Sequence, residues 1–216
     1  MINKIYLYPL PIRIWHWINA AIIIILIITG LQLRFSAFAI MEYSTAALYH
    51  KCIGFTLVGS FLFWFIYCIA SGAMKKHYSL RLRDIKRMFL QGLYYAVGMF
   101  KGKANPFTPT LEEKFNPLQK LSYLTVMLLA TPIAICSGIL LSDIFFFLDF
   151  IRAIGGLRVV DAIHVSVGYF FVIYLLIHIY MSTLGETFCS YIKTMITGYG
   201  RVKIHDTGEK DIETLK

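Results

Sequence analysis

The sequence predicts an all-α fold, an integral membrane four-helix bundle with a cytoplasmic amphipathic surface helix between helices 2 and 3. Hydrophobic residues make up 58% of the 216 residues and charged residues 15%, whereas soluble domains average about half apolar residues. Four stretches reach the roughly 20 apolar residues that cross a hydrocarbon core. Lys and Arg residues gather in one long segment and at the C-terminal end, as in the cytoplasmic parts of membrane proteins.

Four spans divide the chain, and we expect membrane helices at about residues 12–33, 46–70, 118–141 and 160–184. A cytoplasmic loop at 71–117 and a cytoplasmic tail at 185–216 complete one membrane domain, 1–216. The first apolar run resembles a signal peptide, but its length and Trp15-His16-Trp17 at its edge favour a retained helix. We expect Trp15 and Trp17 to belong to the aromatic belt at the membrane surface.

Charge predicts the orientation of these helices. The net charge of +9 could suggest a nucleic-acid partner, but in a membrane protein it more often reports topology. The segment 71–117 holds Lys75, Lys76, Arg81, Arg83, Lys86, Arg87, Lys101, Lys103 and Lys114. We therefore expect a bacterial cytoplasmic (inner) membrane protein with both termini in the cytoplasm, short loops at 34–45 and 142–159 outside, and no nucleic acid.

Part of the long loop has the pattern of an amphipathic helix. Its apolar residues recur at helical spacing among basic ones, and they are Ile85, Met88, Phe89, Leu93 and Ala96. Such a helix typically lies in the lipid headgroup layer. The alternative is a solvated helix that contacts a partner subunit.

Four of the six histidines fall inside predicted spans, where an ionisable residue is costly and usually functional. His16 and His178 match in depth near the cytoplasmic side, and His50 and His164 match near the outer side. His164 and His178 are 14 residues apart, which is about 1,400° of helix rotation and about 21 Å of rise, so they share one side of helix 4. The alternative for each histidine is a hydrogen bond to a neighbouring helix.

Paired imidazoles suit haem iron with two axial histidine ligands. A zinc site would need four ligands close together, and the four cysteines form no C-x-x-C motif for an iron–sulfur cluster. The residue four places after each paired histidine is small, which leaves room for a porphyrin on that helix face; these residues are Ala20, Gly54, Gly168 and Ser182. Two axial ligands leave no open iron position, so the pattern favours electron transfer over oxygen chemistry.

The sequence resembles the bacterial cytochrome b561 and nickel–iron hydrogenase-type cytochrome b superfamily, which includes the cytochrome b subunits of hydrogenase, formate dehydrogenase and thiosulfate reductase. The resemblance rests on Tyr8–Trp17, on His50, on His164 with His178, and on Lys114–Lys120. It implies two non-covalent b haems, with His16 and His178 as axial iron ligands on the cytoplasmic side and His50 and His164 on the outer side.

The resemblance also implies a quinone, menaquinone or ubiquinone, near the cytoplasmic haem beside His178 and Asn116. The alternative for Asn116 is a helix cap before Pro117. Arg13 lies one turn before His16 and could pair with a haem propionate, since Arg binds carboxylates well. It could equally be a positive-inside anchor.

We expect a subunit of a quinone-linked oxidoreductase complex. Its redox partner would be a peripheral subunit, either an iron–sulfur protein, a molybdoenzyme, a hydrogenase or a multihaem cytochrome c. Electrons would pass between the outer haem, the inner haem and quinone, in either direction. One alternative is a stand-alone cytochrome b561 that oxidises a small outer-face donor such as superoxide. Another is a haem-free anchor whose histidines only bond neighbouring helices.

Overall fold

Four long apolar helices form the body of the molecule. The computed structural model describes residues 2–77, 82–103, 105–107, 115–185 and 187–203. In that part of the chain, four helical segments are long and apolar enough to cross a membrane: α1 (Leu10–Arg34), α2 (Tyr43–Ala70), the segment Pro117–Ser142 and α8 (Leu157–Ser182). The expected all-α bundle of four long helices is therefore confirmed. The C-terminal part of the predicted tail, 204–216, lies outside the described residues.

The third long segment changes its helical geometry halfway. It consists of α5 (Pro117–Leu124), the π-helical turn η4 (Thr125–Ala130) and α6 (Thr131–Ser142). Pro132 is the second residue of α6, and it has no N–H to donate to the α-helical hydrogen-bond ladder. The wider π turn accommodates this interruption, and the Thr131 hydroxyl donates to the Val126 carbonyl at 2.8 Å.

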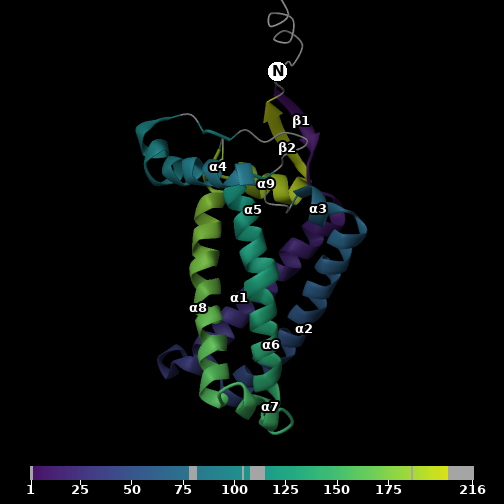
Figure 1. Cartoon of the computed structure of the whole chain (residues 1–216), viewed down its shortest axis with the longest axis vertical. Coiled ribbons are helices and arrows are strands. Elements are labelled where there is room, and N and C mark those ends of the chain that lie inside the picture. The colour runs from purple at the N-terminus through teal and green to yellow at the C-terminus, as the bar shows by residue number, and fades with distance from the viewer. Residues whose placement is uncertain (1, 78–81, 104, 108–114, 186, 204–216) are drawn as a thin grey trace, which may run out of the picture.

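Short helices form a layer across the end of the bundle that the sequence predicts to be cytoplasmic (Figure 1). The layer contains α3 (Ala73–His77), α4 (Leu82–Leu93) and α9 (Ser190–Thr197). After α4 the chain continues as η2 (Tyr94–Gly98), a π-helix, and η3 (Met99–Lys101), a 3-10 turn. Above the layer, β1 (Ile2–Tyr6) pairs antiparallel with β2 (Tyr199–Lys203), from Ile2 opposite Lys203 to Tyr6 opposite Tyr199. The opposite end carries η1 (Ser36–Phe38) and α7 (Leu148–Ala153).

The predicted amphipathic helix is present as α4, and it uses its two faces in an unexpected way. Its apolar side chains Ile85, Phe89 and Leu93 are exposed, whereas Asp84 and Gln91 are buried. The polar side therefore packs on the bundle, and the apolar stripe faces outward. A stripe of this kind suits the headgroup layer, and its lipid contact stays a prediction.

The prediction for Trp15 was wrong. Trp15 is only 9% exposed and belongs to the core cluster with Trp64 and Phe171, while Trp17 is 44% exposed. Its indole N–H donates to the Ser60 carbonyl at 3.0 Å, and its ring stacks on Trp64 with centroids 6.1 Å apart. Because the polar end of the indole is satisfied inside the protein, Trp15 does not need the membrane surface.

Candidate functional site

The structure brings the four membrane histidines together in the two pairs that depth predicts. His16 on α1 faces His178 on α8, with ring centroids 6.1 Å apart and planes at 56°. His50 on α2 faces His164 on α8, again with centroids 6.1 Å apart and with planes at 82°. Two separate pairs from different helices therefore share one spacing, and α8 contributes one histidine to each.

This spacing fits a haem iron between two imidazoles. Two metal–nitrogen bonds of about 2 Å, together with the radii of two five-membered rings, place the ring centres about 6 Å apart. A side chain at Gly54 or Gly168, one turn after His50 and His164, would meet nothing within 4 Å, so these helix faces have room for a flat ligand. Among the described residues, no group of three or more His, Cys, Asp or Glu side chains could hold a bare metal ion.

We call His50 with His164 the outer pair and His16 with His178 the inner pair, after their predicted sides of the membrane. Hydroxyl groups contact the outer pair, and the sequence alone does not reveal these contacts. The Thr29 hydroxyl on α1 lies 2.8 Å from His50 Nδ1, and the Ser137 hydroxyl on α6 lies 2.9 Å from His164 Nδ1. Each hydroxyl thus binds the nitrogen that leaves Nε2 free for iron. A Thr-Gly and a Ser-Gly dipeptide mark these positions in the sequence, but small residues are common in membrane helices, so the signal is weak without the fold.

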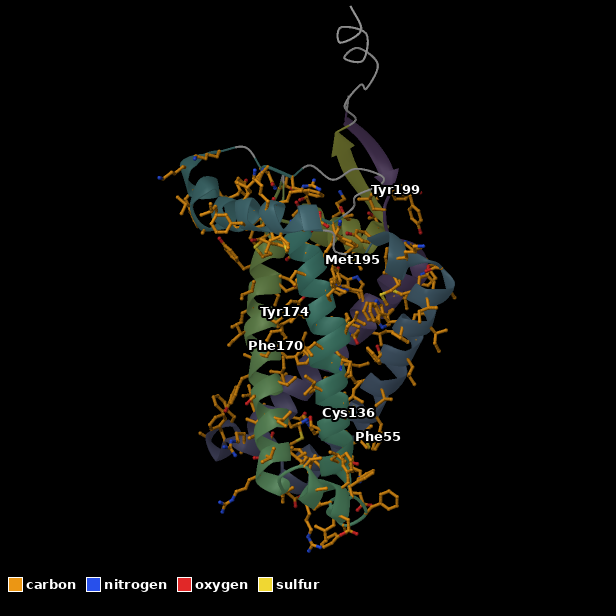
Figure 2. The ribbon with its side chains drawn as sticks, viewed as in Figure 1. Phe55, Cys136, Phe170, Tyr174, Met195 and Tyr199 are labelled. Atoms are coloured by element: carbon orange, nitrogen blue, oxygen red, sulfur yellow. The ribbon has the colours of Figure 1, made fainter. Side chains whose placement is uncertain are left out.

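Aromatic rings contact the inner pair. Tyr174 stacks on His178 with centroids 5.8 Å apart and planes at 20°, and Phe170 stacks on Tyr174 at 6.2 Å and 17°. Figure 2 shows Phe170 and Tyr174 following one another along α8 toward the end that carries α4 and α9. His16 meets Trp17 edge-on at 5.3 Å. Spacing of four residues on one helix produces this column of rings, which fixes the plane of His178.

Arg13, in the first turn of α1, connects this helix to the C-terminal segment. One guanidinium nitrogen donates to the Ile196 carbonyl near the end of α9, where helix carbonyls lack partners within the helix. Its Nε is buried and has no hydrogen-bond partner within the described part of the chain. Arg13 therefore anchors α9, and its remaining donor suits a carboxylate. The propionate role stays a prediction.

Asn116 is a helix cap, as the alternative in the sequence analysis held. Its side chain accepts from Gln119 N at 2.8 Å, and Gln119 Oε1 accepts from Asn116 N at 3.0 Å, which is a capping box. Its Nδ2 also donates to the Tyr95 hydroxyl at 3.2 Å. Burial raises the pKa of Tyr95 above its ordinary value, so the phenol stays protonated at neutral pH. The quinone role of Asn116 stays a prediction.

A buried ion pair lies one turn from Asn116, where α4 packs on α5. Asp84 is fully buried, and its carboxylate lies 3.7 Å from Lys120 Nζ and 3.7 Å from Arg87. Lys120 N donates to the Asn116 carbonyl, so the pair and the cap share one helical turn. The only sequence signal for this ion pair is that Asp84 is the one acidic residue within α4.

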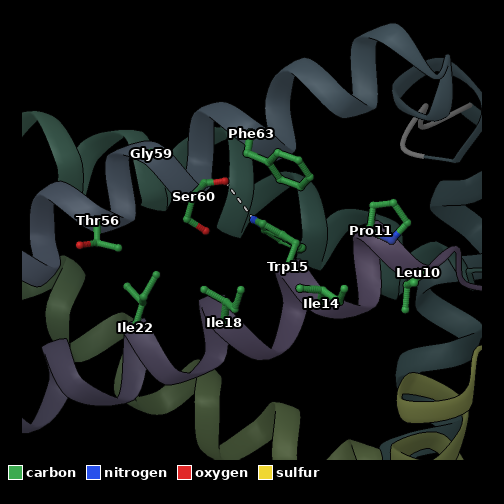
Figure 3. Close-up of a pocket in the computed structure, with 10 residues that line it drawn as sticks. All are labelled: Leu10, Pro11, Ile14, Trp15, Ile18, Ile22, Thr56, Gly59, Ser60 and Phe63. Atoms are coloured by element: carbon green, nitrogen blue, oxygen red, sulfur yellow. Dashed lines mark hydrogen bonds between the residues drawn. The ribbon is translucent and has the colours of Figure 1, made fainter.

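A groove of about 630 Å³ opens between α1 and α2 (Figure 3). Its walls include Ile14, Ile18 and Phe63. Its two hydroxyls already donate their protons, Thr56 to the Cys52 carbonyl and Ser60 to Asn19 Oδ1. The groove therefore presents hydrocarbon surface, which suits an acyl chain better than the polar head of a quinone.

Comparisons with known proteins agree with this geometry. The profile of the prokaryotic cytochrome b561 family matches residues 7–198. A protein of Escherichia coli (strain K12), named "Putative cytochrome YdhU", is 30% identical over 205 residues, which cover 92% of this chain and 76% of the relative. The matched region contains both histidine pairs.

Proposed function

Since the chain belongs to the prokaryotic cytochrome b561 family, we propose that it relays electrons through two b haems between a peripheral redox partner and the quinone pool. Membership of the family makes the chain a membrane protein that binds haem b and transfers electrons. The two-haem proposal rests on one observation, the two imidazole pairs with equal centroid separations of 6.1 Å.

The histidines would hold and orient the two haems. Bound haem b supplies one-electron exchange at iron. His16 with His178 would hold one haem and His50 with His164 the other, and a haem held by two imidazoles would supply electron transfer in place of oxygen chemistry. The two ligands on α8 are separated by about 21 Å along the helix. The two proposed haem sites would therefore be separated by most of the thickness of the apolar layer of the membrane.

The proposed quinone site lies at the junction of α4 and α5, beside Asn116 and Tyr95. Asn116 is buried, and its Nδ2 donates to the hydroxyl of the half-buried Tyr95. Two such groups can bind a quinone carbonyl and hold a proton near it. Quinone reduction and quinol oxidation use the same two residues, and menaquinone or ubiquinone fits the proposal.

The substrate chemistry would belong to a partner subunit on the outer side, beside His50 and His164. The chain's four cysteines are unpaired and dispersed, so an iron–sulfur protein, a molybdoenzyme, a hydrogenase or a multihaem cytochrome c would supply or take the electrons. Membrane purification separates this proposal from a stand-alone cytochrome. A redox subunit that co-purifies supports the relay, whereas a solitary protein that reduces quinone with superoxide supports the alternative.

The rate of electron transfer to a quinone, compared between the parent protein and the Asn116→Ser variant, tests the proposed relay. Serine keeps a good helix cap but removes the amide donor. We expect a quinone analogue such as menadione to reoxidise the dithionite-reduced parent protein in nanodiscs. With loss of one hydrogen bond, worth about 1 kcal/mol, Asn116→Ser should react several-fold more slowly at unchanged haem content. Stopped-flow absorbance at the haem α band measures both rates.

Two outcomes would count against this account. A reduced parent protein that menadione does not reoxidise would contradict quinone exchange. An Asn116→Ser protein with the parent's rate would remove Asn116 from the site, and leave it as a cap alone.

A further inference from the structure

The outer histidine pair is supported by the same device in two different helical hairpins. Thr29 and Gly30 lie near the end of α1 and face His50, the eighth residue of α2. Ser137 and Gly138 lie near the end of α6 and face His164, the eighth residue of α8. The two hairpins have different sequences, so the repetition points to a shared requirement at the imidazoles.

Each hydroxyl acts together with one backbone carbonyl to determine which ring nitrogen carries the proton, because the Leu26 carbonyl also hydrogen-bonds the His50 ring and the Ala134 carbonyl hydrogen-bonds the His164 ring. The Thr29 hydroxyl donates its only proton to the Ile25 carbonyl at 2.8 Å, and the Ser137 hydroxyl donates to the Ile133 carbonyl at 2.6 Å. Each oxygen can then only accept from the histidine, so Nδ1 carries the hydrogen. Nε2 keeps its lone pair and is free to bind iron.

The glycines determine where the rings lie. A Cβ built on Gly30 would approach His50 Cε1 to 3.1 Å, and one on Gly138 would approach His164 Cε1 to 3.2 Å. Both distances are shorter than ordinary van der Waals contact, so any side chain there would push the imidazole away. The glycine allows the ring to lie against the neighbouring helix, where the preceding hydroxyl reaches Nδ1.

We propose that Thr29 and Ser137 are positioning residues that help the backbone carbonyls fix the tautomer of His50 and His164 and that lower the midpoint potential of the outer haem. The inference rests on the proposed two-haem function. A hydrogen bond from Nδ1–H to an acceptor makes the imidazole a stronger donor to iron. A stronger donor stabilises ferric iron, and second-shell hydrogen bonds are an established control of haem potential. Because each hydroxyl donates its proton to a backbone carbonyl, its oxygen becomes a stronger hydrogen-bond acceptor for the histidine.

The inner pair provides an internal reference. His178 stacks on Tyr174, and His16 meets Trp17 edge-on, so aromatic rings orient these imidazoles. Thr29 and Ser137 lie toward the other end of the long helices from these aromatic contacts. A change at either hydroxyl should therefore alter one haem and leave the other unchanged.

The test compares Thr29→Val and Ser137→Ala with the parent protein in nanodiscs. Valine keeps the shape of threonine but cannot accept the hydrogen bond. Thr29→Ser keeps the hydroxyl and should behave as the parent does. Thr56→Val is the matched control, because the Thr56 hydroxyl also donates to a carbonyl four residues earlier but contacts no histidine ring in the described structure. Optical redox titration gives both midpoint potentials, and low-spin electron paramagnetic resonance reports the ligand field of each haem.

We expect Thr29→Val and Ser137→Ala to raise one of the two potentials and to shift one low-spin signal, with the second haem unchanged. Gly30→Ala should weaken retention of that same haem by about tenfold, as loss of an outer-shell support does. Two parent-like potentials in Thr29→Val and Ser137→Ala would overturn this inference and leave the two-haem function intact. A parent protein without two haems would overturn both.

Discussion

Histidine placement explains the site at the level of single residues. A membrane-embedded imidazole is expensive unless it is paired or bonded, and each of the four histidines has a partner ring 6.1 Å away. Around them, hydroxyls serve the outer pair and aromatic rings serve the inner pair. The two haem sites would therefore differ in their surroundings while sharing one ligand type.

Tyr8 supplies a residue-scale prediction of pH dependence. Burial raises the pKa of Tyr8 from 10.0 to about 12, with Tyr191 adding to the shift. Below pH 10 the phenol is protonated in the folded and unfolded chains alike. Between pH 10 and 12 only the unfolded chain releases the proton, so the free energy of unfolding should fall as pH rises. Tyr8→Phe should lose less stability over this range.

Thermal unfolding in detergent at pH 9 and pH 11 measures this effect. Tyr6→Phe is the control, since the Tyr6 ring is 47% exposed in the same segment. An equal loss of stability on raising the pH in the parent and in Tyr8→Phe would show that Tyr8 is not responsible.

The sequence predicts some of these residues far better than others. The depths of the four histidines in the membrane can be predicted, because histidine is rare inside apolar runs. The contacts of Thr29 and Ser137 with these histidines cannot be predicted, because a hydroxyl in a membrane helix usually bonds its own backbone. Here each hydroxyl does that and contacts a histidine as well, and only the packing of two helices shows the second contact.

At the level of elements, a buried charge holds the surface helix to the bundle. Asp84 on α4 is fully buried between Lys120 on α5 and Arg87 on its own helix. Gln91, two turns later on the same face, donates to Asn105 at 3.1 Å. The polar stripe of α4 thus faces the protein, and its exposed apolar stripe is free to contact lipid.

Lys120→Met should destabilise this docking strongly. Removing one member of a buried ion pair typically costs about 3–5 kcal/mol, and the remaining contact with Arg87 should reduce that cost. The double variant Asp84→Asn with Lys120→Met should recover most of the stability, because no uncompensated charge remains. Chemical denaturation in detergent gives the free energies. A single Lys120→Met variant as stable as the parent would contradict a docking role for the pair.

The elements that the sequence analysis missed depend on distant contacts. The strands β1 and β2 come from opposite ends of the chain, and neither has a long alternating pattern of its own. Arg13 connects the same regions by bonding the Ile196 carbonyl. In contrast, the long helices follow from the length of their apolar runs and α4 follows from its apolar periodicity, so the sequence predicts them directly.

At the level of the whole molecule, α8 is shared by both histidine pairs. His164 and His178 lie on one side of this helix, and α2 and α1 supply their respective partners. The bundle therefore presents two histidine pairs toward opposite ends of one helix. Two haems held there, as we propose, would pass an electron from one side of the membrane to the other.

Haem stoichiometry tests this claim most directly. A pyridine haemochrome assay on the purified protein should find two b haems per chain. His50→Ala and His178→Ala should each lose one, and His77→Ala, a control at the end of α3 outside the long helices, should keep both. A colourless parent protein would contradict the cytochrome account, and two haems retained in His50→Ala would contradict the outer pair.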